Sequence, residues 1–348
     1  MTMNVAFGSD NHAGVHPHIL KAMNDCNKGY AIAYGDDEYT EHLEQMFHQQ
    51  FGPDCIPFLV YNGTAANILG LKAVTDSFHA IYCPETAHLN VHECGGPEHF
   101  LGCKLITLPT PDGKLTVDLV REAMFGVGDP HVAQPRVISI TQPTELGTLY
   151  SIKELKDLST FAHNNDMILH MDGARLGNAA AALHTGFKEL TSEVGVDVLS
   201  FGGTKNGMMC GESVIFFNKT YAQHFHYIRK QGMQLASKMR YLAVQFEAYF
   251  ADELWRKNAS HANAMAQLLA SELQQIPKLT ITQKIEGNAV FVVIPPPILK
   301  QIQKHYFFHV FNEALSEARL MCSFSMTKAD IMQFVDTIKK ISEKEQLC

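Results

Sequence analysis

Short apolar runs alternate with helical patterns through most of the chain. The apolar runs predict strands at Ile56–Tyr61, Ala80–Cys83, Lys104–Leu108, Val137–Thr141, Ile168–Asp172, Val196–Phe201 and Ser213–Phe217. Helices are predicted between them, at Asp37–Phe51, Thr64–Thr75, Thr116–Phe125, Ser151–Asn164 and Phe187–Val194. This alternation indicates an α/β fold, in which a mostly parallel central sheet carries helices on both faces.

The pattern changes after Phe217, where long helical stretches begin. Helices are predicted at Lys219–Lys230, Ser237–Ala251 and Leu254–Gln275, strands at Leu279–Gln283 and Ala289–Ile294, and a final amphipathic helix at Lys328–Lys344. We interpret the triplet Pro295–Pro297 as a loop. Two domains are therefore expected. Residues 1–251 form an N-terminal arm and a large α/β domain, and residues 252–348 form a smaller α+β domain.

Composition narrows the possible partners and the compartment. The chain has 348 residues, 46% of them hydrophobic and 18% charged, which is typical of a soluble globular protein. Its net charge is −8, and the sequence contains no block of like charges. Neither nucleic acid nor an anionic membrane is therefore an expected partner. No apolar run reaches about 18 residues, and the start lacks a basic segment before an apolar one, so we predict neither a membrane span nor a signal peptide.

The cysteines and histidines give no metal or redox motif. The 8 cysteines form no Cys-x-x-Cys pair, and free thiols in a reducing cytoplasm explain them most simply. His12, His16 and His18 could suggest a metal, but Pro17 interrupts the group and no nearby carboxylate or cysteine completes it. We expect a cytoplasmic protein without a metal.

Two polar residues follow apolar runs and suggest a cofactor. Asp172 stands in Leu-His-Met-Asp-Gly-Ala-Arg and Lys205 in Ser-Phe-Gly-Gly-Thr-Lys-Asn-Gly, a spacing that suits neighbouring parallel strands joined by a helical crossover. Ligands bind at the carboxyl ends of such strands. A lysine can hold pyridoxal 5'-phosphate (PLP) as a Schiff base, and an aspartate can keep its pyridine nitrogen protonated. The alternative is an ordinary α/β protein with a lysine in a Gly-rich turn.

Three further segments fit a PLP site. Asn62-Gly63-Thr64-Ala65-Ala66-Asn67 joins a strand to a helix, so that a glycine, a hydroxyl and free N–H groups can cradle a phosphate, although Gly-Thr also serves as a plain cap. His88 lies just past a strand and can stack on a pyridine ring, or it can be an ordinary core histidine. Tyr34-Gly35-Asp36-Asp37-Glu38 is a turn with an acidic helix start.

In this order, the segments resemble the threonine aldolase/β-eliminating lyase family of fold-type I PLP enzymes. The resemblance extends from Ser9-Asp10 to the last helix. Its most specific parts are Tyr-Gly-Asp-Asp, Gly-Thr-x-Ala-Asn, Ala-His followed by Glu93-x-Gly95-Gly96, and His-Met-Asp-Gly-Ala-Arg. It implies a transferase-like fold that binds PLP in the large domain, and a homodimer or homotetramer with active sites at subunit interfaces.

The resemblance also implies roles for individual residues. The cofactor-binding set consists of Gly63, Thr64, His88, Asp172, Lys205, Lys230 and Lys238. Of these, Lys230 and Lys238 would reach the phosphate of a neighbouring subunit. The substrate carboxylate would be held by Ser9, Arg175 and Arg319, the last at the entry to a strand before the final helix. The catalytic set would be Lys205, His88, Asp172 and Glu145.

Glu145 marks a departure from the family. Members that cleave threonine usually read Glu-Asn-Thr-His-Asn-Gly where this chain reads Gln142-Pro143-Thr144-Glu145-Leu146-Gly147. Their second active-site histidine, which is linked to the substrate β-hydroxyl, therefore falls on Glu145. This segment resembles a subgroup that includes phenylserine aldolases, which makes a bulkier substrate a serious candidate.

The resemblance implies PLP-dependent retro-aldol cleavage of a β-hydroxy-α-amino acid, of the L-threonine/L-allo-threonine or phenylserine type, to glycine and an aldehyde. The base for the β-hydroxyl proton is then His88, Glu145 or an ordered water. β-Elimination and transamination are alternatives within PLP chemistry. The missing Gly-x-Gly-x-x-Gly turn argues against a nucleotide-binding oxidoreductase, and a non-catalytic scaffold would conflict with so many polar site residues.

Overall fold

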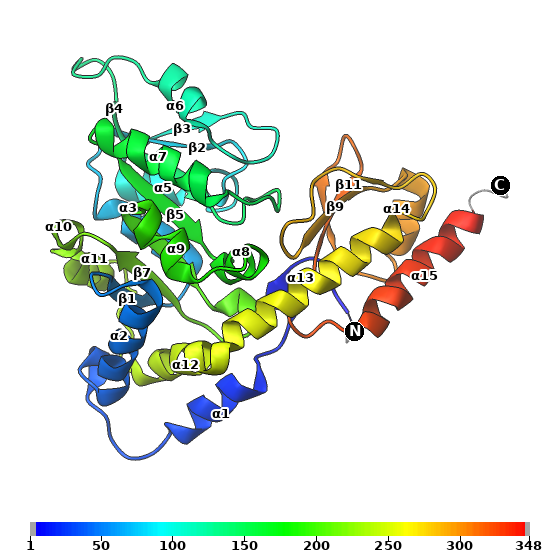
Figure 1. Cartoon of the computed structure of the whole chain (residues 1–348), viewed down its shortest axis with the longest axis horizontal. Coiled ribbons are helices and arrows are strands. Elements are labelled where there is room, and N and C mark those ends of the chain that lie inside the picture. Colours follow the sequence, from blue (N-terminus) through cyan, green and yellow to red (C-terminus); the bar gives the residue numbers. More distant parts are fainter. Residues whose placement is uncertain (1–4, 345–348) are drawn as a thin grey trace.

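The computed structural model describes residues 5–344 of the chain. Figure 1 shows a larger part built on one sheet, a smaller part built on another, and the long helix α13 (Leu254–Leu273) running from the first to the second. The sheets contain seven and four strands. Among the described residues, no helix is long and apolar enough to cross a membrane.

The large sheet has the order β1-β7-β6-β5-β4-β2-β3. Its strands are β1 (Ile56–Val60), β2 (His79–Pro84), β3 (Lys104–Leu108), β4 (Gln134–Thr141), β5 (Ile168–Gly173), β6 (Val198–Gly202) and β7 (Glu212–Phe216). The pairs β2–β3, β2–β4, β4–β5 and β5–β6 are parallel, and only β7 is antiparallel to both of its neighbours. All of the strands predicted here are confirmed, and so is the mostly parallel sheet.

Helices cover both faces of the large sheet. One apolar core contains side chains of α1 (Pro17–Asp25), α2 (Glu38–Phe51), α6 (Val117–Ala123), α7 (Ile152–Asn164), α8 (Leu176–Ala182), α9 (Phe187–Leu190) and α12 (Arg240–Phe250). The core on the other face contains side chains of α3 (Gly63–Lys72), α4 (His88–Val91), α5 (Gly96–Leu101), α10 (Lys219–Ala222) and α11 (Phe225–Gln231). The predicted helix Lys219–Lys230 is therefore two helices, because the backbone leaves the helical region at His224.

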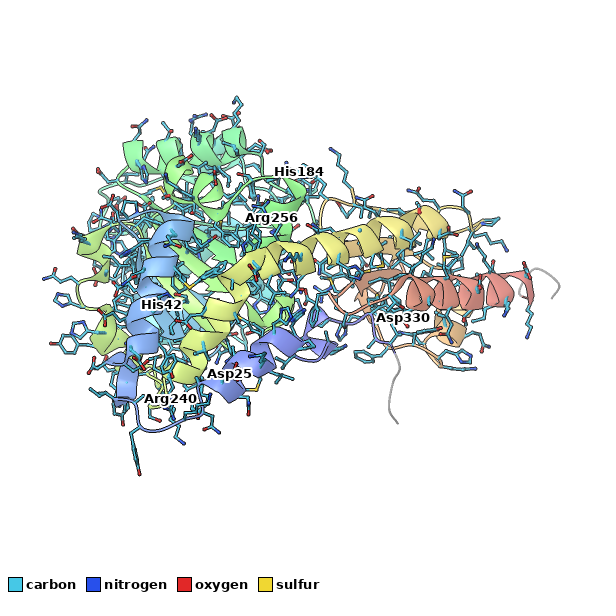
Figure 2. The ribbon with its side chains drawn as sticks, turned by 60° about the horizontal axis from the view of Figure 1, so that its bottom comes forward. Asp25, His42, His184, Arg240, Arg256 and Asp330 are labelled. Atoms are coloured by element: carbon cyan, nitrogen blue, oxygen red, sulfur yellow. The ribbon has the colours of Figure 1, made fainter. Side chains whose placement is uncertain are left out.

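The small sheet is antiparallel, with the order β10-β11-β9-β8. Its strands are β8 (Thr280–Ile281), β9 (Ala289–Val293), β10 (His309–Asn312) and β11 (Glu317–Met321), and its helices are α14 (Pro296–Ile302) and α15 (Lys328–Lys344). In Figure 2, α15 begins near Asp330 and runs beside α13. The N-terminal arm joins this part, because Phe7 lies in its apolar core and Phe7 N–H donates to the Phe307 carbonyl at 2.8 Å.

The loop predicted at Pro295–Pro297 is wrong. Pro296 and Pro297 are the first residues of α14. Proline fits the first helical turn because its fixed φ suits a helix and the N–H that it lacks would have no intrahelical acceptor. Ile298 and Ile302 then bury one side of α14 in the small core. The division of the chain at residues 251 and 252 remains a prediction.

Candidate active site

Lys205 and Asp172 stand at the ends of neighbouring strands of the large sheet. Asp172 is the next-to-last residue of β5, and β6 leads through Gly203 into a short 3₁₀ helix, η4 (Thr204–Asn206), which carries Lys205. β5 and β6 pair in parallel, with Asp172 opposite Ser200. The predicted placement of the two residues after adjacent parallel strands is therefore confirmed.

Both side chains line a cavity of about 290 Å³, and the start of α3 forms another part of its wall. The Asn62 side chain caps α3 by accepting the Ala65 N–H at 2.9 Å. The first N–H groups of a helix have no intrahelical acceptor, so those of Gly63 and Thr64 can bind an anion in the cavity. A Cβ at Gly63 would meet no atom within 4 Å, which shows that glycine leaves open space here. His88 lines the same cavity.

Asp172 is buried and accepts hydrogen bonds at both carboxylate oxygens. Its Oδ1 accepts the Ala174 N–H at 3.0 Å, and its Oδ2 accepts from Asn67 Nδ2 at 2.9 Å. Burial alone would raise the pKa of Asp172, but the charge on Lys205, these two hydrogen bonds and His88 together hold its pKa below the usual value. The cavity therefore contains a fixed carboxylate next to a lysine.

His88 is held by a carboxylate that the motif contains but to which we assigned no role. His88 Nδ1 lies 3.0 Å from Glu93 Oε1, and Asn67 Nδ2 donates to the same oxygen at 2.9 Å. The hydrogen bond to Glu93 raises the pKa of His88 against the opposing effect of burial, with smaller contributions from the charges of Glu145 and Asp172. Asn67 therefore links the carboxylate at His88 to the carboxylate at Asp172.

Glu212, on β7, also lines the cavity and was not predicted. Burial raises the pKa of Glu212 to about 7, although Thr204 and Lys205 lower it in part. Gly202, on β6, pairs with Glu212 on the neighbouring strand β7. A Cβ atom at Gly202 would lie 2.1 Å from Glu212 Oε2. A carboxyl group thus fills the space that a larger residue at Gly202 would need. The signal in the sequence was a glutamate directly before the apolar run Ser213–Phe217.

Arg175 is oriented by Asp10 of the N-terminal arm. Arg175 Nε and Nη2 donate to the two carboxylate oxygens of Asp10 at 2.6 and 2.9 Å, and Asn288 Nδ2 donates to Asp10 Oδ2 at 3.1 Å. Burial opposes ionisation, but Arg175 and these bonds hold the pKa of Asp10 below its usual value. One edge of the guanidinium is therefore occupied, and Arg175 offers a substrate only its remaining N–H groups. Ser9 directly precedes Asp10 and caps η1 (Asp10–His12).

Arg319, on β11, lies beside Glu145 in the loop after β4. The distance from Arg319 Nη1 to Glu145 Oε2 is 4.0 Å, which is a long ion pair and not a hydrogen bond. Arg319 Nε is buried and has no hydrogen-bond partner among the described residues. Burial and the nearby charge of Arg175 lower the pKa of Arg319, against the effect of Glu145. The two arginines and Glu145 are thus close enough for their charges to act on one another, while the predicted carboxylate clamp stays a prediction.

Lys230 and Lys238 stand on the surface of the molecule. Lys230 is exposed on α11, with its Nζ 5.2 Å from the ring centre of Tyr34, and Lys238 is exposed before α12. Of the described residues, those that line the cavity include neither lysine.

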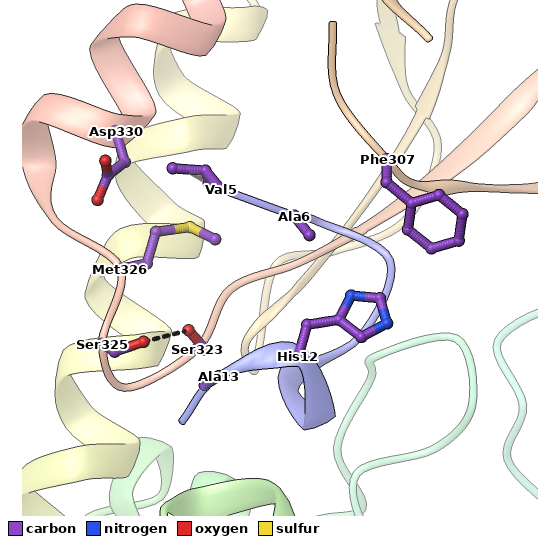
Figure 3. Close-up of a pocket in the computed structure, with 9 residues that line it drawn as sticks. All are labelled: Val5, Ala6, His12, Ala13, Phe307, Ser323, Ser325, Met326 and Asp330. Atoms are coloured by element: carbon purple, nitrogen blue, oxygen red, sulfur yellow. Dashed lines mark hydrogen bonds between the residues drawn. The ribbon is translucent and has the colours of Figure 1, made fainter. Parts of the chain in front are cut away.

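A larger cavity, of about 540 Å³, lies between the N-terminal arm and the small part of the molecule (Figure 3). It is lined by Val5, Ala6, His12, Ala13, Phe307, Ser323, Ser325, Met326 and Asp330. Asp330 Oδ2 accepts the Thr327 N–H at 2.8 Å at the start of α15, and Ser323 Oγ lies 3.2 Å from Ser325 Oγ, so each of these polar groups already has a partner. Within residues 5–344, no three His, Cys, Asp or Glu side chains gather as a metal site. Size alone therefore does not locate the chemistry.

The residues around the smaller cavity fit PLP. The cavity combines an anion-binding helix start, a lysine, a buried carboxylate of lowered pKa and a histidine ring. These groups match the phosphate, the aldehyde carbon, the pyridine nitrogen and the flat face of the cofactor. One buried oxygen of a lining residue, Asn67 Oδ1, has no partner among the described residues, so the lining still offers a group that a polar ligand can complete.

Comparison with known proteins agrees with this geometry. The model of the β-eliminating lyase family matches residues 6–295. A low specificity L-threonine aldolase of Pseudomonas sp. is 42% identical over 337 residues, covering 96% of this chain and 97% of the relative. The one from Pseudomonas aeruginosa is 43% identical over 320 residues, covering 91% and 92%. A solved threonine aldolase of Leishmania major has a TM-score of 0.91 at 25% identity, covering 97% of this chain and 99% of that one.

Proposed function

Because the chain belongs to the β-eliminating lyase family, we propose that it is a PLP-dependent aldehyde-lyase. It cleaves a β-hydroxy-α-amino acid, of the L-threonine/L-allo-threonine or phenylserine type, to glycine and an aldehyde. The family resemblance inferred from the sequence is confirmed, and so is the fold-type I architecture.

One observation carries this proposal. Lys205, Asp172, His88 and the start of α3 line a single cavity, and Arg175 follows directly after Ala174, which also lines it. In the proposed arrangement, Lys205 holds PLP covalently, Gly63 and Thr64 bind its phosphate, Asp172 faces its pyridine nitrogen and His88 stacks on its ring. When bound, PLP supplies a sink for the electron pair left at Cα when the Cα–Cβ bond breaks.

Arg319 and Arg175 hold the substrate carboxylate in this proposal, with Ser9 as a third contact. Arg319 has the more open guanidinium, because Asp10 occupies the Nε edge of Arg175. A charged hydrogen bond from each arginine fixes the carboxylate, and thereby the orientation of Cα and of the bond to Cβ. Asp10 keeps Arg175 in one orientation before the substrate arrives.

The β-hydroxyl proton needs an acceptor during cleavage. His88, Glu145 and an ordered water are the candidates. Glu145 is placed against Arg319, while His88 lines the cofactor cavity itself. The choice between them decides which side chain contacts the β-hydroxyl group of the substrate.

Product analysis tests the function directly. PLP-loaded protein is given L-threonine, L-allo-threonine and L-threo-phenylserine in parallel, and glycine, aldehyde, ammonia and keto acid are measured. We expect glycine and the matching aldehyde in equal amounts, with turnover and the absorbance of bound PLP both lost in Lys205→Ala. Ammonia and a keto acid without glycine would establish β-elimination instead. Conversion of PLP to its amine form would establish transamination.

We further propose a homodimer or homotetramer in which Lys230 and Lys238 complete the site of a neighbouring subunit. Two observations support this: neither lysine is among the described residues that line the chain's own cavity, and Lys230 lies beside the exposed ring of Tyr34. Mixing inactive Lys205→Ala with weakened Lys230→Ala subunits should restore activity, because a hybrid contains one site with both lysines intact. No recovery in subunits that demonstrably exchange would contradict shared sites.

We also propose that the enzyme works in the cytoplasm. The cysteines of the described residues are free thiols, and Cys348 lies outside these residues. Free thiols persist in a reducing compartment. Fractionation of the native cells, with the protein detected in the cytoplasmic extract, would test this.

A further inference from the structure

A chain of hydrogen bonds joins His88 to Asp172 through two buried side chains. His88 Nδ1 lies 3.0 Å from Glu93 Oε1, Asn67 Nδ2 donates to the same oxygen at 2.9 Å, and Asn67 Nδ2 also donates to Asp172 Oδ2 at 2.9 Å. Asn67 is central in α3, whereas Glu93 stands in the turn between α4 and α5. Both amide hydrogens of Asn67 are thus used to hold two carboxylates.

Glu93 is placed to control its neighbour and not to meet a ligand. Its side chain is 0% exposed, whereas that of His88 is 32% exposed. The residues that line the cofactor cavity include His88, Asn67 and Asp172, but Glu93 stands behind them. A buried carboxylate costs free energy unless it is paired, so the bond to His88 is the most effective compensation available to Glu93.

The hydrogen bond fixes which nitrogen of His88 can exchange a proton. An ionised carboxylate only accepts hydrogen bonds, so Nδ1 must carry its hydrogen toward Glu93. Nε2 is then the nitrogen left to gain or lose a proton. A base that is oriented in this way by a third group is a recurring arrangement in catalysis.

We propose that Glu93 is a positioning residue, which holds the Nδ1–H of His88 and thereby makes Nε2 the atom that accepts the β-hydroxyl proton of the substrate. Asn67 keeps the Glu93 carboxylate at a fixed distance from Asp172. The inference rests on the proposed function, because it assigns the base of that reaction. It also makes a statement about His88 in the protein without cofactor or substrate.

The charged groups that act on His88 come from several elements. Glu93 follows α4, Asp172 ends β5, Glu145 lies in the loop after β4, and His92 is one turn along from His88 with its ring centre 5.5 Å away. The carboxylates favour the charged imidazole and His92, when charged, opposes it. Of these described groups, Glu93 alone has a direct hydrogen bond to the His88 side chain. Its removal should therefore have the largest effect on the titration of His88.

The test compares Glu93→Gln, which has the same shape without the charge, with Glu98→Gln, which removes an exposed carboxylate five positions further along. The pKa of His88 is measured by NMR in apoprotein with isotope-labelled histidine, and its signal is identified by its loss in His88→Asn. The pH profile of kcat/KM is measured in the PLP-loaded enzyme. Glu93→Asp, which keeps the charge on a shorter side chain, is the conservative variant.

We expect Glu93→Gln to lower the pKa of His88 and to move the acid limb of the kcat/KM profile to lower pH. The plateau should fall by on the order of tenfold, which is the lower end of the effect seen when carboxylate partners of metal-bound histidines are removed. Glu93→Asp should lie between this variant and wild type, and Glu98→Gln should match wild type.

An unchanged His88 pKa and acid limb in Glu93→Gln would overturn the proposal. So would a loss of activity that follows only from lower PLP affinity or lower thermal stability, both measured on the same samples. The apoprotein titration separates this inference from the proposed function. If wild type released no glycine while His88 still responded to Glu93, the reaction assignment would fail and the coupling between the two side chains would stand.

Discussion

The cofactor end and the substrate end of the site differ in how fully their charged groups are paired. At the cofactor end, Asp172 accepts two hydrogen bonds at 2.9 and 3.0 Å, and one oxygen of Glu93 accepts two more. At the substrate end, Arg175 is already paired with Asp10 at 2.6 and 2.9 Å, but Arg319 reaches Glu145 only at 4.0 Å, and its buried Nε has no partner among the described residues.

This difference matches what each end has to bind. A resident cofactor is served by groups that are fixed in advance, since reorganising them at each turnover would cost free energy. The substrate arrives and leaves, so its site keeps a donor free for the incoming carboxylate. A buried donor without a partner costs about 1–3 kcal/mol, and a substrate carboxylate at Arg319 would remove that cost. The loosely paired arginine is thus the one that we expect to discriminate substrates.

The largest effect should follow from neutralising the carboxylate at the cofactor end. Asp172→Asn keeps the shape of the side chain and removes the charge that faces the pyridine nitrogen. We expect kcat to fall on the order of 10²–10³-fold, as for other fixed electrostatic groups in active sites. The rate is measured at full PLP occupancy, which is monitored by absorbance. A loss of less than tenfold would show that tight pairing at this end does not serve catalysis.

Glu212 is the exception at the cofactor end, because its carboxyl group has a raised pKa of about 7. Protonation is favoured in the folded protein, so stability is retained below the ordinary pKa of 4.5 and lost as pH rises toward 7. This loss is on the order of 3 kcal/mol for a fully buried group. Glu212→Gln should remove it, so that the variant gains stability over wild type between pH 5 and 8.

The free energy of unfolding of the apoprotein is measured with urea at about pH 5 and about pH 8. One protein concentration is used throughout, because subunit association also contributes to stability. Glu98→Gln serves as the exposed control. If the difference between Glu212→Gln and wild type did not change with pH, the Glu212 carboxyl group would be ionised in the folded state throughout.

The sequence predicted the framework of the site better than its pairing. Lys205 and Asp172 follow apolar runs, and such runs locate strand ends in a parallel sheet. The contact between Asp10 and Arg175 joins positions 165 residues apart, so no local pattern announces it. Asn67 belongs to the segment that was predicted to bind a phosphate. Its link between Glu93 and Asp172, however, depends on how α3 packs on the sheet.

Among the local features that the sequence analysis missed, α8 and the start of β7 were missed for different physical reasons. The helix α8 was not predicted because its residues, Leu-Gly-Asn-Ala-Ala-Ala-Ala, are buried on nearly all sides and show no amphipathic period. The start of β7 was placed one residue late, after Glu212, because charged residues are rarely buried in strands. In both cases tertiary packing outweighed the local signal.

A smaller effect is expected at the arginine of the substrate end. Arg319→Lys keeps the charge but loses the planar fork that can hold a carboxylate by two bonds. We expect kcat/KM to fall about 10–100-fold, mainly through KM, since the loss of a charged hydrogen bond costs about 1.5–3 kcal/mol. Arg256→Lys is the matched control, because that guanidinium lies over Trp255 on α13, 4.6 Å from the ring centre. Equal effects of the two variants would remove Arg319 from the carboxylate site.

The smallest effect, and the sharpest division between roles, is expected at Glu145. Its oxygen lies 4.0 Å from Arg319, so its charge competes with a substrate carboxylate for the same guanidinium. Glu145→Gln should therefore lower KM a few-fold. It should lower kcat by less than about tenfold, because His88 Nε2 accepts the proton in our proposal. Loss of a general base would instead lower kcat by about 10²–10⁴-fold. Steady-state kinetics with L-threonine and L-threo-phenylserine measure both constants. A hundredfold fall in kcat with KM unchanged would make Glu145 the base, and the loosely paired end of the site would then perform the proton transfer.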